Sequence, residues 1–363
     1  MGLSLYTEST HGGNLRLACE KYGGSENDFI DFSASINPLP RPRDIKSYIL
    51  NALDSIKRYP DDDATGFVKR VSDVYGVPEE NVLAGNGTSE ILFFLSLINA
   101  NQSALIVSPT FSEYERSLVN ANCRVRKIYL DSLNNFGFNT EDAKDILPRV
   151  KLVYLCNPNN PTSNLISPKK ELLKFVNLAS KKGVLVIIDE AFIDMVPDES
   201  LIKEASSSDN LAVVRSMTKF FGLAGLRLGF AVGARGIIDK MKALRFPWSV
   251  NSLALSVGEK ILGDKEFIKN SLEFLMRERE FLYQGLKGIK GLYPYPSSTN
   301  FIFVRIGLKN LTSTELYHSL ARERILIRDC SSFDGLDGRY FRVAVRERTD
   351  NEKLLERLKE VIN

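Results

Sequence analysis

Four apolar runs begin near residues 104, 152, 184 and 211, and stretches with helical patterning separate them. Unbroken apolar runs are typical of strands that are covered on both faces, as in the parallel sheets of α/β proteins. In such sheets, ligands bind where the strands end at their carboxyl side. The sequence therefore predicts an α/β fold with a functional site at one edge of a mostly parallel sheet.

The last of these runs leads into segment 213–230, which reads Val-Val-Arg-Ser-Met-Thr-Lys-Phe-Phe-Gly-Leu-Ala-Gly-Leu-Arg-Leu-Gly-Phe. Its short hydroxyl residues and glycines leave backbone N–H groups exposed to an anion. Apolar neighbours on both sides of Lys219 would partly desolvate its amine, which lowers the pKa and leaves a neutral amine that can attack an aldehyde. The alternative is a solvated lysine that opens a helix beside glycines that only pack.

Segment 82–90 joins a short strand to an apolar helix through a glycine-containing turn. Gly87, Thr88 and Ser89 stand at the helix N-terminus, where backbone N–H groups and the helix dipole favour an anion. A dinucleotide-binding loop would need a third glycine where Glu90 stands, and no Walker lysine motif occurs in the sequence. The segment therefore fits a site for a single phosphate better than one for NAD or ATP.

Three further segments carry polar or aromatic residues where a predicted strand ends. The run near residue 184 ends at Asp189, a pattern that a Walker B segment shares, although its Walker A partner is missing. The run near residue 104 is followed by Phe111 and Tyr114, which could stack on a flat ligand ring or belong to the core. The run near residue 152 ends in Asn-Pro-Asn-Asn-Pro-Thr, residues 157–162.

In combination, the Ser-x-Thr-Lys and Gly-Leu-Arg-Leu-Gly motifs of segment 213–230 and the Asn-Pro-Asn-Asn-Pro-Thr loop resemble the class I/II aminotransferase family. These are fold type I enzymes that depend on pyridoxal 5′-phosphate (PLP). The resemblance implies a large domain, residues 40–246, with a mostly parallel central sheet. It also implies a small α+β domain formed by both termini, residues 1–39 and 247–363, and an active homodimer.

The resemblance assigns the residues of a PLP site. Lys219 would hold the cofactor as a Schiff base, Asp189 would keep the pyridine nitrogen protonated, and Asn160 would donate to O3′; these three are the expected catalytic residues. Phe111 takes the place of the family's stacking residue. Tyr59 would reach the cofactor phosphate from the partner subunit, although an ordinary turn tyrosine gives the same pattern. The other expected cofactor contacts are Gly87, Thr88, Ser89, Ser216, Thr218 and Arg227.

The amino-terminal motifs are similar to those of one branch of this family, the L-threonine-O-3-phosphate decarboxylases of cobalamin biosynthesis. They are His-Gly-Gly-Asn at residues 11–14 and Asp-Phe-Ser-Ala-Ser-Ile-Asn-Pro at residues 31–38. Phe192 and the Phe-Pro-Trp-Ser-Val-Asn stretch at residues 246–251 are shared with that branch, but Ser35 replaces its usual asparagine. The expected substrate contacts are His11, Gly12, Ser35, Asn37, Asn160, Arg328 and Arg342.

Two arginines stand in strand-like segments near the end of the sequence, at residues 325–330 and 338–346. On neighbouring strands, Arg328 and Arg342 could bind a substrate that carries both a carboxylate and a phosphate, although edge-strand arginines are usually solvated. The bond at the substrate Cα that stands perpendicular to the cofactor ring is the one that breaks. Because the two arginines would set the orientation of the substrate, they would select the reaction.

We expect decarboxylation of L-threonine O-3-phosphate to (R)-1-amino-2-propanol O-2-phosphate. The alternatives are a histidinol-phosphate aminotransferase that uses 2-oxoglutarate, a decarboxylase that prefers serine phosphate, and a PLP-binding regulator. The regulator is disfavoured because such proteins carry a DNA-binding domain for which this sequence has no spare length.

Composition narrows the class of protein further. The formal net charge is +3, from 48 basic and 45 acidic residues, so nucleic acid is not an expected partner. The 4 cysteines form no CxxC pair, which argues against a zinc or disulfide scaffold, and no metal is expected. No apolar run approaches the ~20 residues of a membrane helix, and the start shows no signal-peptide pattern. We expect a soluble cytoplasmic protein.

Overall fold

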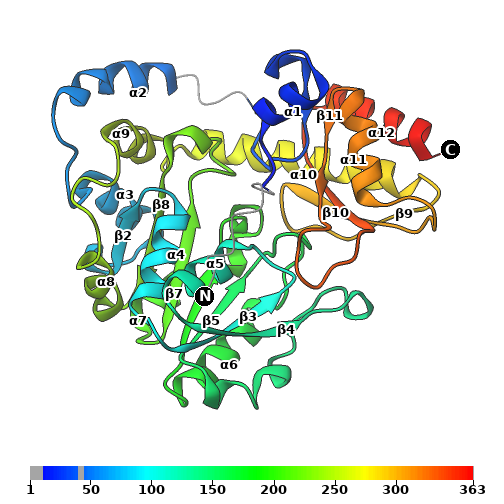
Figure 1. The fold of residues 1–363 in the computed structure, drawn as a ribbon. Helices are drawn as coiled ribbons and strands as arrows, with labels where there is room; N and C mark the ends of the chain where they lie inside the picture. Colours follow the sequence, from blue (N-terminus) through cyan, green and yellow to red (C-terminus); the bar gives the residue numbers. More distant parts are fainter. Residues whose placement is uncertain (1–10, 40–44, 363) are drawn as a thin grey trace.

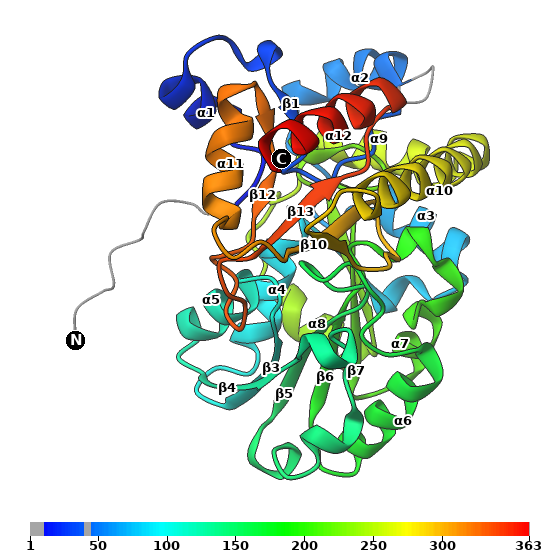
Figure 2. The same ribbon diagram turned by 90° about the vertical axis from the view of Figure 1, so that its right-hand side faces the viewer.

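The computed structural model describes residues 11–39 and 45–362 (Figure 1). Its largest sheet within these ranges has 7 strands in the order β2-β8-β7-β6-β5-β3-β4. Figure 2 shows α4 (Thr88–Leu97) and α5 (Glu113–Asn120) on one side of this sheet and α6 (Lys169–Ser180) and α7 (Ile202–Ser207) on the other. The strands are β2 (Val82–Gly85), β3 (Ser103–Ser108), β4 (Arg124–Tyr129), β5 (Leu152–Cys156), β6 (Leu185–Asp189), β7 (Leu211–Ser216) and β8 (Gly229–Gly233).

The strands predicted near residues 104, 152, 184 and 211 are β3, β5, β6 and β7, and they are parallel, as predicted. The sequence did not single out β4, which pairs in parallel with β3, or β8. Strand β8 is antiparallel to both β7 and β2. Segment 217–228, which joins β7 to β8, contains a 3-10 turn at Ala224–Leu226 but no α-helix of the kind that usually connects parallel strands.

Helices cover both faces of this sheet. They connect its strands or pack beside them. They are α3 (Thr65–Tyr75), α4 (Thr88–Leu97), α5 (Glu113–Asn120), α6 (Lys169–Ser180), α7 (Ile202–Ser207), α8 (Arg235–Lys242) and α9 (Ser252–Ile261). Helix α2 (Ile45–Ala52), which continues into a 3-10 turn at Leu53–Lys57, packs against α9.

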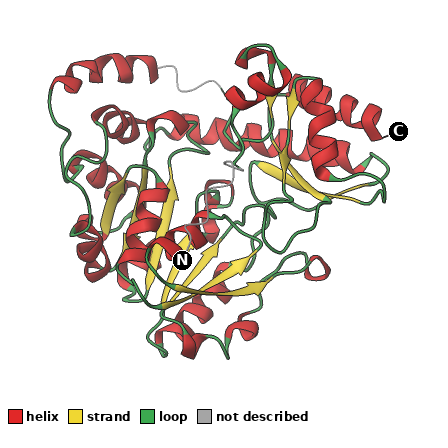
Figure 3. Cartoon of the chain, in the orientation of Figure 1, coloured by secondary structure: helices red, strands yellow, loops and turns green. Residues whose placement is uncertain are grey.

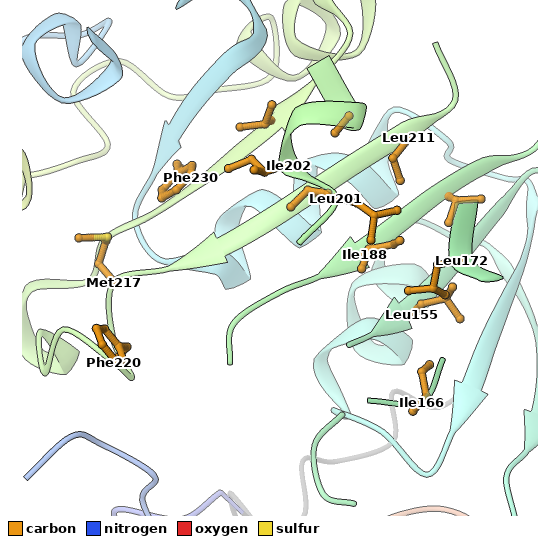
Figure 4. Packing of buried hydrophobic residues seen from close by; sticks show 14 of the residues in the cluster. Leu155, Ile166, Leu172, Ile188, Leu201, Ile202, Leu211, Met217, Phe220 and Phe230 are labelled. Carbon is orange, nitrogen blue, oxygen red and sulfur yellow. The ribbon is translucent and has the colours of Figure 1, made fainter. Parts of the chain in front are cut away.

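The two faces of the central sheet bury separate apolar clusters. Along β7, Leu211 and Val213 join one cluster, and Ala212 and Val214 join the other. This alternation follows from the opposite directions of successive side chains in a strand. Figure 4 shows part of the first cluster, in which Leu155, Ile188 and Leu211 come from three neighbouring strands and Leu172 comes from α6.

Smaller sheets form a second group of strands beside the first (Figure 3). One has the order β12-β13-β10-β9, and the other pairs β1 with β11. The elements of this group are α1 (Leu15–Tyr22), β1 (Ile30–Asp31), α10 (Lys265–Lys287), β9 (Leu292–Pro294), β10 (Phe301–Ile306), α11 (Ser313–Arg322), β11 (Ile325–Leu326), β12 (Arg328–Asp329), β13 (Tyr340–Ala344) and α12 (Arg348–Ile362).

Residues near the two ends of the chain lie together in this second group. Ile30 of β1 is the parallel partner of Ile325 of β11, and α1 packs against α11. The predicted division into residues 40–246 on one side, and 1–39 with 247–363 on the other, stays a prediction. Of those ranges, residues 1–10, 40–44 and 363 lie outside the described part. No helix within the described part is long and apolar enough to cross a membrane.

A buried ion cluster links the ends of two central strands. Arg215 of β7 donates to Asp194 over 2.6 Å and lies 3.5 Å from a carboxylate oxygen of Glu190. Glu190 follows β6 and also accepts hydrogen bonds from Ser200 and from the backbone N–H of Leu201. The guanidinium therefore compensates two carboxylates that are out of contact with water.

We predict that Arg215→Ala lowers the free energy of unfolding by about 3–5 kcal/mol, because it leaves two buried carboxylates without a cation. Arg235→Ala is the matched control, since the Arg235 and Asp239 side chains are exposed. Its expected cost is below about 1 kcal/mol. Urea unfolding followed by circular dichroism measures both changes, and equal costs for the two variants would contradict the buried-cluster interpretation.

Candidate active site

A cavity of about 750 Å³ lies at the carboxyl ends of β3, β5, β6 and β7. The smaller sheets and the amino-terminal segment form its other wall. The cavity therefore lies where the sequence predicted the functional site. Thirteen of the predicted site residues line it: His11, Gly12, Thr88, Ser89, Phe111, Asn160, Asp189, Ser216, Thr218, Lys219, Arg227, Arg328 and Arg342.

Lys219 follows the end of β7 and lines the cavity with its amine. Its neighbours Met217 and Phe220 belong to the apolar cluster of the central sheet (Figure 4), as the sequence suggested. Burial and, to a smaller extent, the positive charges of Arg342 and Arg227 lower the pKa of Lys219 to about 8. About one tenth of the amine is therefore neutral at pH 7.

Asp189 ends β6 and is almost fully buried. Its Oδ1 accepts a hydrogen bond from the backbone N–H of Ala191 over 2.9 Å, and its Oδ2 accepts one from the Tyr114 hydroxyl over 2.7 Å. Burial raises the pKa of Asp189 to about 6, while the hydrogen bond from Tyr114 and that from Ala191 lower it. This leaves a carboxylate that is ionised at neutral pH at the base of the cavity.

The anion-binding niche combines two segments that the sequence singled out. Thr88 and Ser89 begin α4, and Ser216, Thr218 and Arg227 come from the end of β7 and the segment that follows it. Gly87 does not line the cavity. It adopts a φ of +78°, and a Cβ atom there would lie 2.4 Å from Nη2 of Arg227, so glycine lets the guanidinium approach the helix N-terminus.

Arg328 and Arg342 lie directly opposite each other on β12 and β13, so the prediction of neighbouring strands is confirmed. Burial lowers the pKa of Arg342 to about 10 and also lowers the pKa of Arg328. Arg342 donates to Oδ1 of Asn160 and to the backbone oxygen of Ser33, but its Nε has no partner in the described part of the chain. This buried donor is therefore open to an acceptor atom in the cavity.

Some predicted residues do not reach the cavity. Asn37 donates its amide hydrogens to the Phe220 carbonyl and the Ser271 hydroxyl, each over 2.9 Å, so its side chain is already used to fix the segment around Lys219. Ser35 is buried, and its hydroxyl has no hydrogen-bond partner within the described residues. Neither residue lines the cavity, so the structure does not support the expected direct substrate contacts.

Tyr59 also lies outside the cavity lining. Its side chain is 77% exposed, and its ring stacks on Trp248 with 4.3 Å between ring centroids. The role expected for it depends on a partner subunit and stays a prediction.

Other residues of the cavity were not assigned from the sequence. Tyr114 was considered as a second stacking candidate, but it is fully buried and donates to Asp189. Its place three residues after Phe111, in the first turn of α5, is a signal that could have linked it to the site. Glu113 also lines the cavity, and its carboxylate lies 3.1 Å from Nε2 of His11, a predicted substrate contact. The ring centroid of Phe192, another lining residue, lies 6.0 Å from Nζ of Lys219.

Sequence relatives cover nearly the whole chain. Threonine-phosphate decarboxylase of Salmonella typhimurium is 36% identical over 357 residues, which span 98% of this chain and 97% of the relative. Histidinol-phosphate aminotransferase of Methanocaldococcus jannaschii is 33% identical over 94% of this chain and 91% of its own length. The adenosylcobalamin biosynthesis bifunctional protein CobDQ of Leptospira interrogans is 31% identical over 95% of this chain and 40% of its own length.

Solved structures with the same fold include the histidinol-phosphate aminotransferase of Clostridium acetobutylicum. That structure has a TM-score of 0.86 and 32% sequence identity, and the match covers 92% of this chain and 98% of that one. The histidinol-phosphate aminotransferase of Sinorhizobium meliloti, in complex with pyridoxal 5′-phosphate, has a TM-score of 0.87 and 19% identity, with 99% and 98% covered. The second likeness supports the fold alone.

The fold and the site define a PLP-dependent enzyme of fold type I, with a mostly parallel central sheet. The family model for aminotransferases of class I and II matches residues 27–358, and the chain belongs to this family. The prediction of fold is thereby confirmed, and membership of this family confirms the prediction of the cofactor.

The cavity fits this cofactor in its chemistry. Lys219 supplies an amine for the aldehyde, Asp189 supplies a buried carboxylate, and the start of α4 with Arg227 supplies a cradle for one phosphate. The glycine at position 87 keeps this cradle open to the Arg227 guanidinium.

We predict that PLP added to enzyme freed of its cofactor becomes bound to Lys219 at an initial rate that rises about tenfold per pH unit below pH 8 and levels off above it, and that borohydride then fixes the product on Lys219. The neutral amine is the nucleophile, and burial lowers its pKa to about 8. Peptide mass spectrometry measures the modified lysine. Lys219→Ala abolishes the labelling and the lysine-bound cofactor absorbance, while the exposed Lys182→Ala keeps both. A rate that still rises tenfold between pH 9 and pH 10 would indicate an ordinary lysine.

Proposed function

We propose that this enzyme decarboxylates L-threonine O-3-phosphate to (R)-1-amino-2-propanol O-2-phosphate, as a step of cobalamin biosynthesis. The observation that carries the proposal is the pair formed by Arg328 and Arg342, which lie opposite each other in the cavity that contains Lys219. Two guanidinium groups suit a small substrate with two anionic ends. Relatives named threonine-phosphate decarboxylase and CobDQ support the same substrate and pathway.

The buried arginine is the better candidate for the substrate phosphate. Arg342 is held by Asn160 and the Ser33 carbonyl, and its unpaired Nε leaves one donor for a ligand. Arg328 donates to the Ser332 hydroxyl over 3.0 Å and is less buried than Arg342. If Arg342 holds the phosphate, the carboxylate is free to stand perpendicular to the cofactor ring, and its bond to Cα becomes the reactive one.

When bound, the cofactor withdraws electron density from the bonds to Cα. Loss of CO2 breaks the Cα–carboxylate bond and leaves its electron pair at Cα, which must then take up one proton. Lys219 is the proposed donor, because its Nζ lies in the cavity and its pKa of about 8 leaves it mostly protonated at neutral pH. Asp189 supplies the negative charge proposed to face the cofactor ring nitrogen.

Transamination of histidinol phosphate is the second candidate. Histidinol-phosphate aminotransferases are among the relatives above 30% identity and among the structures with the same fold. The amino-terminal His-Gly-Gly motif, Phe192 and the stretch at residues 246–251 favour the decarboxylase. A third possibility is a preference for serine phosphate, which lacks one methyl group of threonine phosphate. The shape of the pocket decides whether that methyl group is recognised.

We predict that the purified enzyme with L-threonine O-3-phosphate releases one CO2 for each 1-amino-2-propanol O-2-phosphate formed. Gas detection and mass spectrometry measure the two products. Serine phosphate, assayed in parallel, gives a lower kcat/KM if the pocket recognises the methyl group. Glutamate formation from histidinol phosphate and 2-oxoglutarate, without CO2 release from threonine phosphate, would favour the aminotransferase instead.

A matched pair of variants tests the anchoring arginine within this assay. Arg342→Lys is expected to lower kcat/KM about 10- to 100-fold, because lysine cannot reproduce charge-assisted bonds from a fork of donors. Arg339→Lys is the control, since Arg339 is exposed and pairs with Asp337 outside the cavity. An equal effect of both changes would remove the case for an anchor at Arg342.

We also propose that the enzyme acts as a homodimer in which Tyr59 completes the partner's phosphate site. Tyr59 stacks on Trp248, and both side chains are exposed. Other exposed large apolar residues stand close to these two in the sequence; they are Leu50, Leu53, Ile56 and Phe246. Exposed apolar residues that gather in one patch are typical of a protein interface.

Mixed subunits test this arrangement. We predict that Tyr59→Ala and Lys219→Ala are each impaired alone, and that unfolding and refolding them together produces activity above that of either variant. The mixed dimer would contain one site with both native residues. Decarboxylation is assayed, and analytical ultracentrifugation reports the dimer. Failure to gain activity, despite mixed dimers, would place Tyr59 outside the partner's site.

A further inference from the structure

The Asp189 carboxylate is enclosed by neutral hydrogen-bond donors. Its two oxygens accept from the Ala191 backbone N–H and from the Tyr114 hydroxyl. Within the described residues it forms no salt bridge with lysine or arginine. Tyr114 is therefore the side chain in the described part of the molecule that holds this carboxylate by a direct hydrogen bond. A buried carboxylate without a paired cation depends strongly on such donors.

Tyr114 is rigidly held in this position. It is fully buried in the first turn of α5, and its ring lies parallel to that of Tyr154 with 5.2 Å between centroids. On another side it meets Phe111 edge to face, at 5.7 Å. The Ser117 hydroxyl donates to the Tyr114 carbonyl and holds the turn. The hydroxyl thus has a fixed direction toward Oδ2 of Asp189.

Charge and burial support the same conclusion. Burial raises the pKa of Asp189, and the hydrogen bond from Tyr114 is the strongest influence that lowers it. Burial also raises the pKa of Tyr114 well above its usual value, so the hydroxyl stays protonated and continues to donate. Tyr114 therefore stays a hydrogen-bond donor, and this hydrogen bond helps the Asp189 carboxylate to remain ionised.

We propose that Tyr114 is a positioning residue for the cofactor: its hydroxyl keeps the Asp189 carboxylate ionised and oriented, so that Asp189 can hold the proton on the cofactor ring nitrogen. This inference rests on the ring-nitrogen role proposed for Asp189. Without the hydroxyl, Asp189 becomes a poorer anion and draws the shared proton toward itself. The ring then withdraws electrons less strongly, and the bond to Cα breaks more slowly.

The matched variants are Tyr114→Phe and Tyr154→Phe. Both residues are buried tyrosines of one stacked pair, but the Tyr154 hydroxyl donates to the Leu92 carbonyl and does not contact Asp189. Each variant therefore removes one buried hydroxyl, and Tyr114→Phe alone removes a hydrogen bond to the carboxylate.

The holoenzyme is prepared with cofactor labelled with ¹⁵N at the ring nitrogen, and its NMR signal is recorded without substrate. In Tyr114→Phe the equilibrium between the two proton positions is expected to shift about tenfold toward Asp189, and the signal moves toward that of unprotonated pyridine. Tyr154→Phe is expected to keep the wild-type signal. With substrate, Tyr114→Phe lowers kcat and leaves KM nearly unchanged.

A double-mutant cycle separates this role from a general structural one. If Tyr114 acts through Asp189, adding Tyr114→Phe to Asp189→Asn produces no further movement of the nitrogen signal. An unchanged signal in folded Tyr114→Phe, or an equal movement in Tyr154→Phe, would overturn the proposal. If Tyr114→Phe does not fold, ring-fluorinated tyrosine at position 114, a stronger donor of similar shape, must move the signal toward the protonated value.

The nitrogen signal is recorded in the absence of substrate, so an error in the proposed substrate would leave this result untouched. If Asp189→Asn leaves the wild-type signal unchanged, the proposed contact between Asp189 and the ring nitrogen fails instead. An error in the proposed substrate, in the contact between Asp189 and the ring nitrogen, or in the role of Tyr114 would therefore each give a different experimental result.

Discussion

The active site depends on holding an amine and a carboxylate out of water at one edge of a sheet. Asp189 ends β6 and Lys219 follows the end of β7, and these strands are parallel neighbours. Burial brings the pKa of the acid up to about 6 and that of the amine down to about 8. At neutral pH the acid therefore remains charged while the amine keeps a reactive neutral fraction, and the cofactor chemistry needs both.

The second group of strands adds positive charge to this edge. Arg342 of β13 is buried, meets Asn160 across the cavity and contributes to the lowered pKa of Lys219. Arg342, which is proposed to bind a substrate anion, thus also lowers the pKa of the reactive Lys219 amine. A bound phosphate would neutralise part of that positive charge, so substrate binding and the proton affinity of Lys219 are coupled in this arrangement.

Much of this site could be predicted from the sequence, because its residues follow the predicted strands directly. Lys219, Asp189 and the start of α4 carry recognisable motifs, and parallel strands bring their carboxyl ends to one edge. Ser35 and Asn37 were expected to contact the substrate because they lie in the motif at residues 31–38. The burial of Asn37 depends on its bonds to Phe220 and to Ser271 of α10, and the Ser35 carbonyl accepts from Asn300; no local pattern reports these partners.

The sequence by itself determined the four parallel strands β3, β5, β6 and β7, the phosphate-binding turn, the lysine and the acid, since these depend on local periodicity and on motifs within short segments. Only the tertiary structure decided that Arg328 and Arg342 lie opposite each other, that Asn37 is saturated by its neighbours, and that Tyr114 donates to Asp189. The physical reason is that hydrogen bonds and burial at these positions join residues distant in the chain, and their partners are fixed by packing.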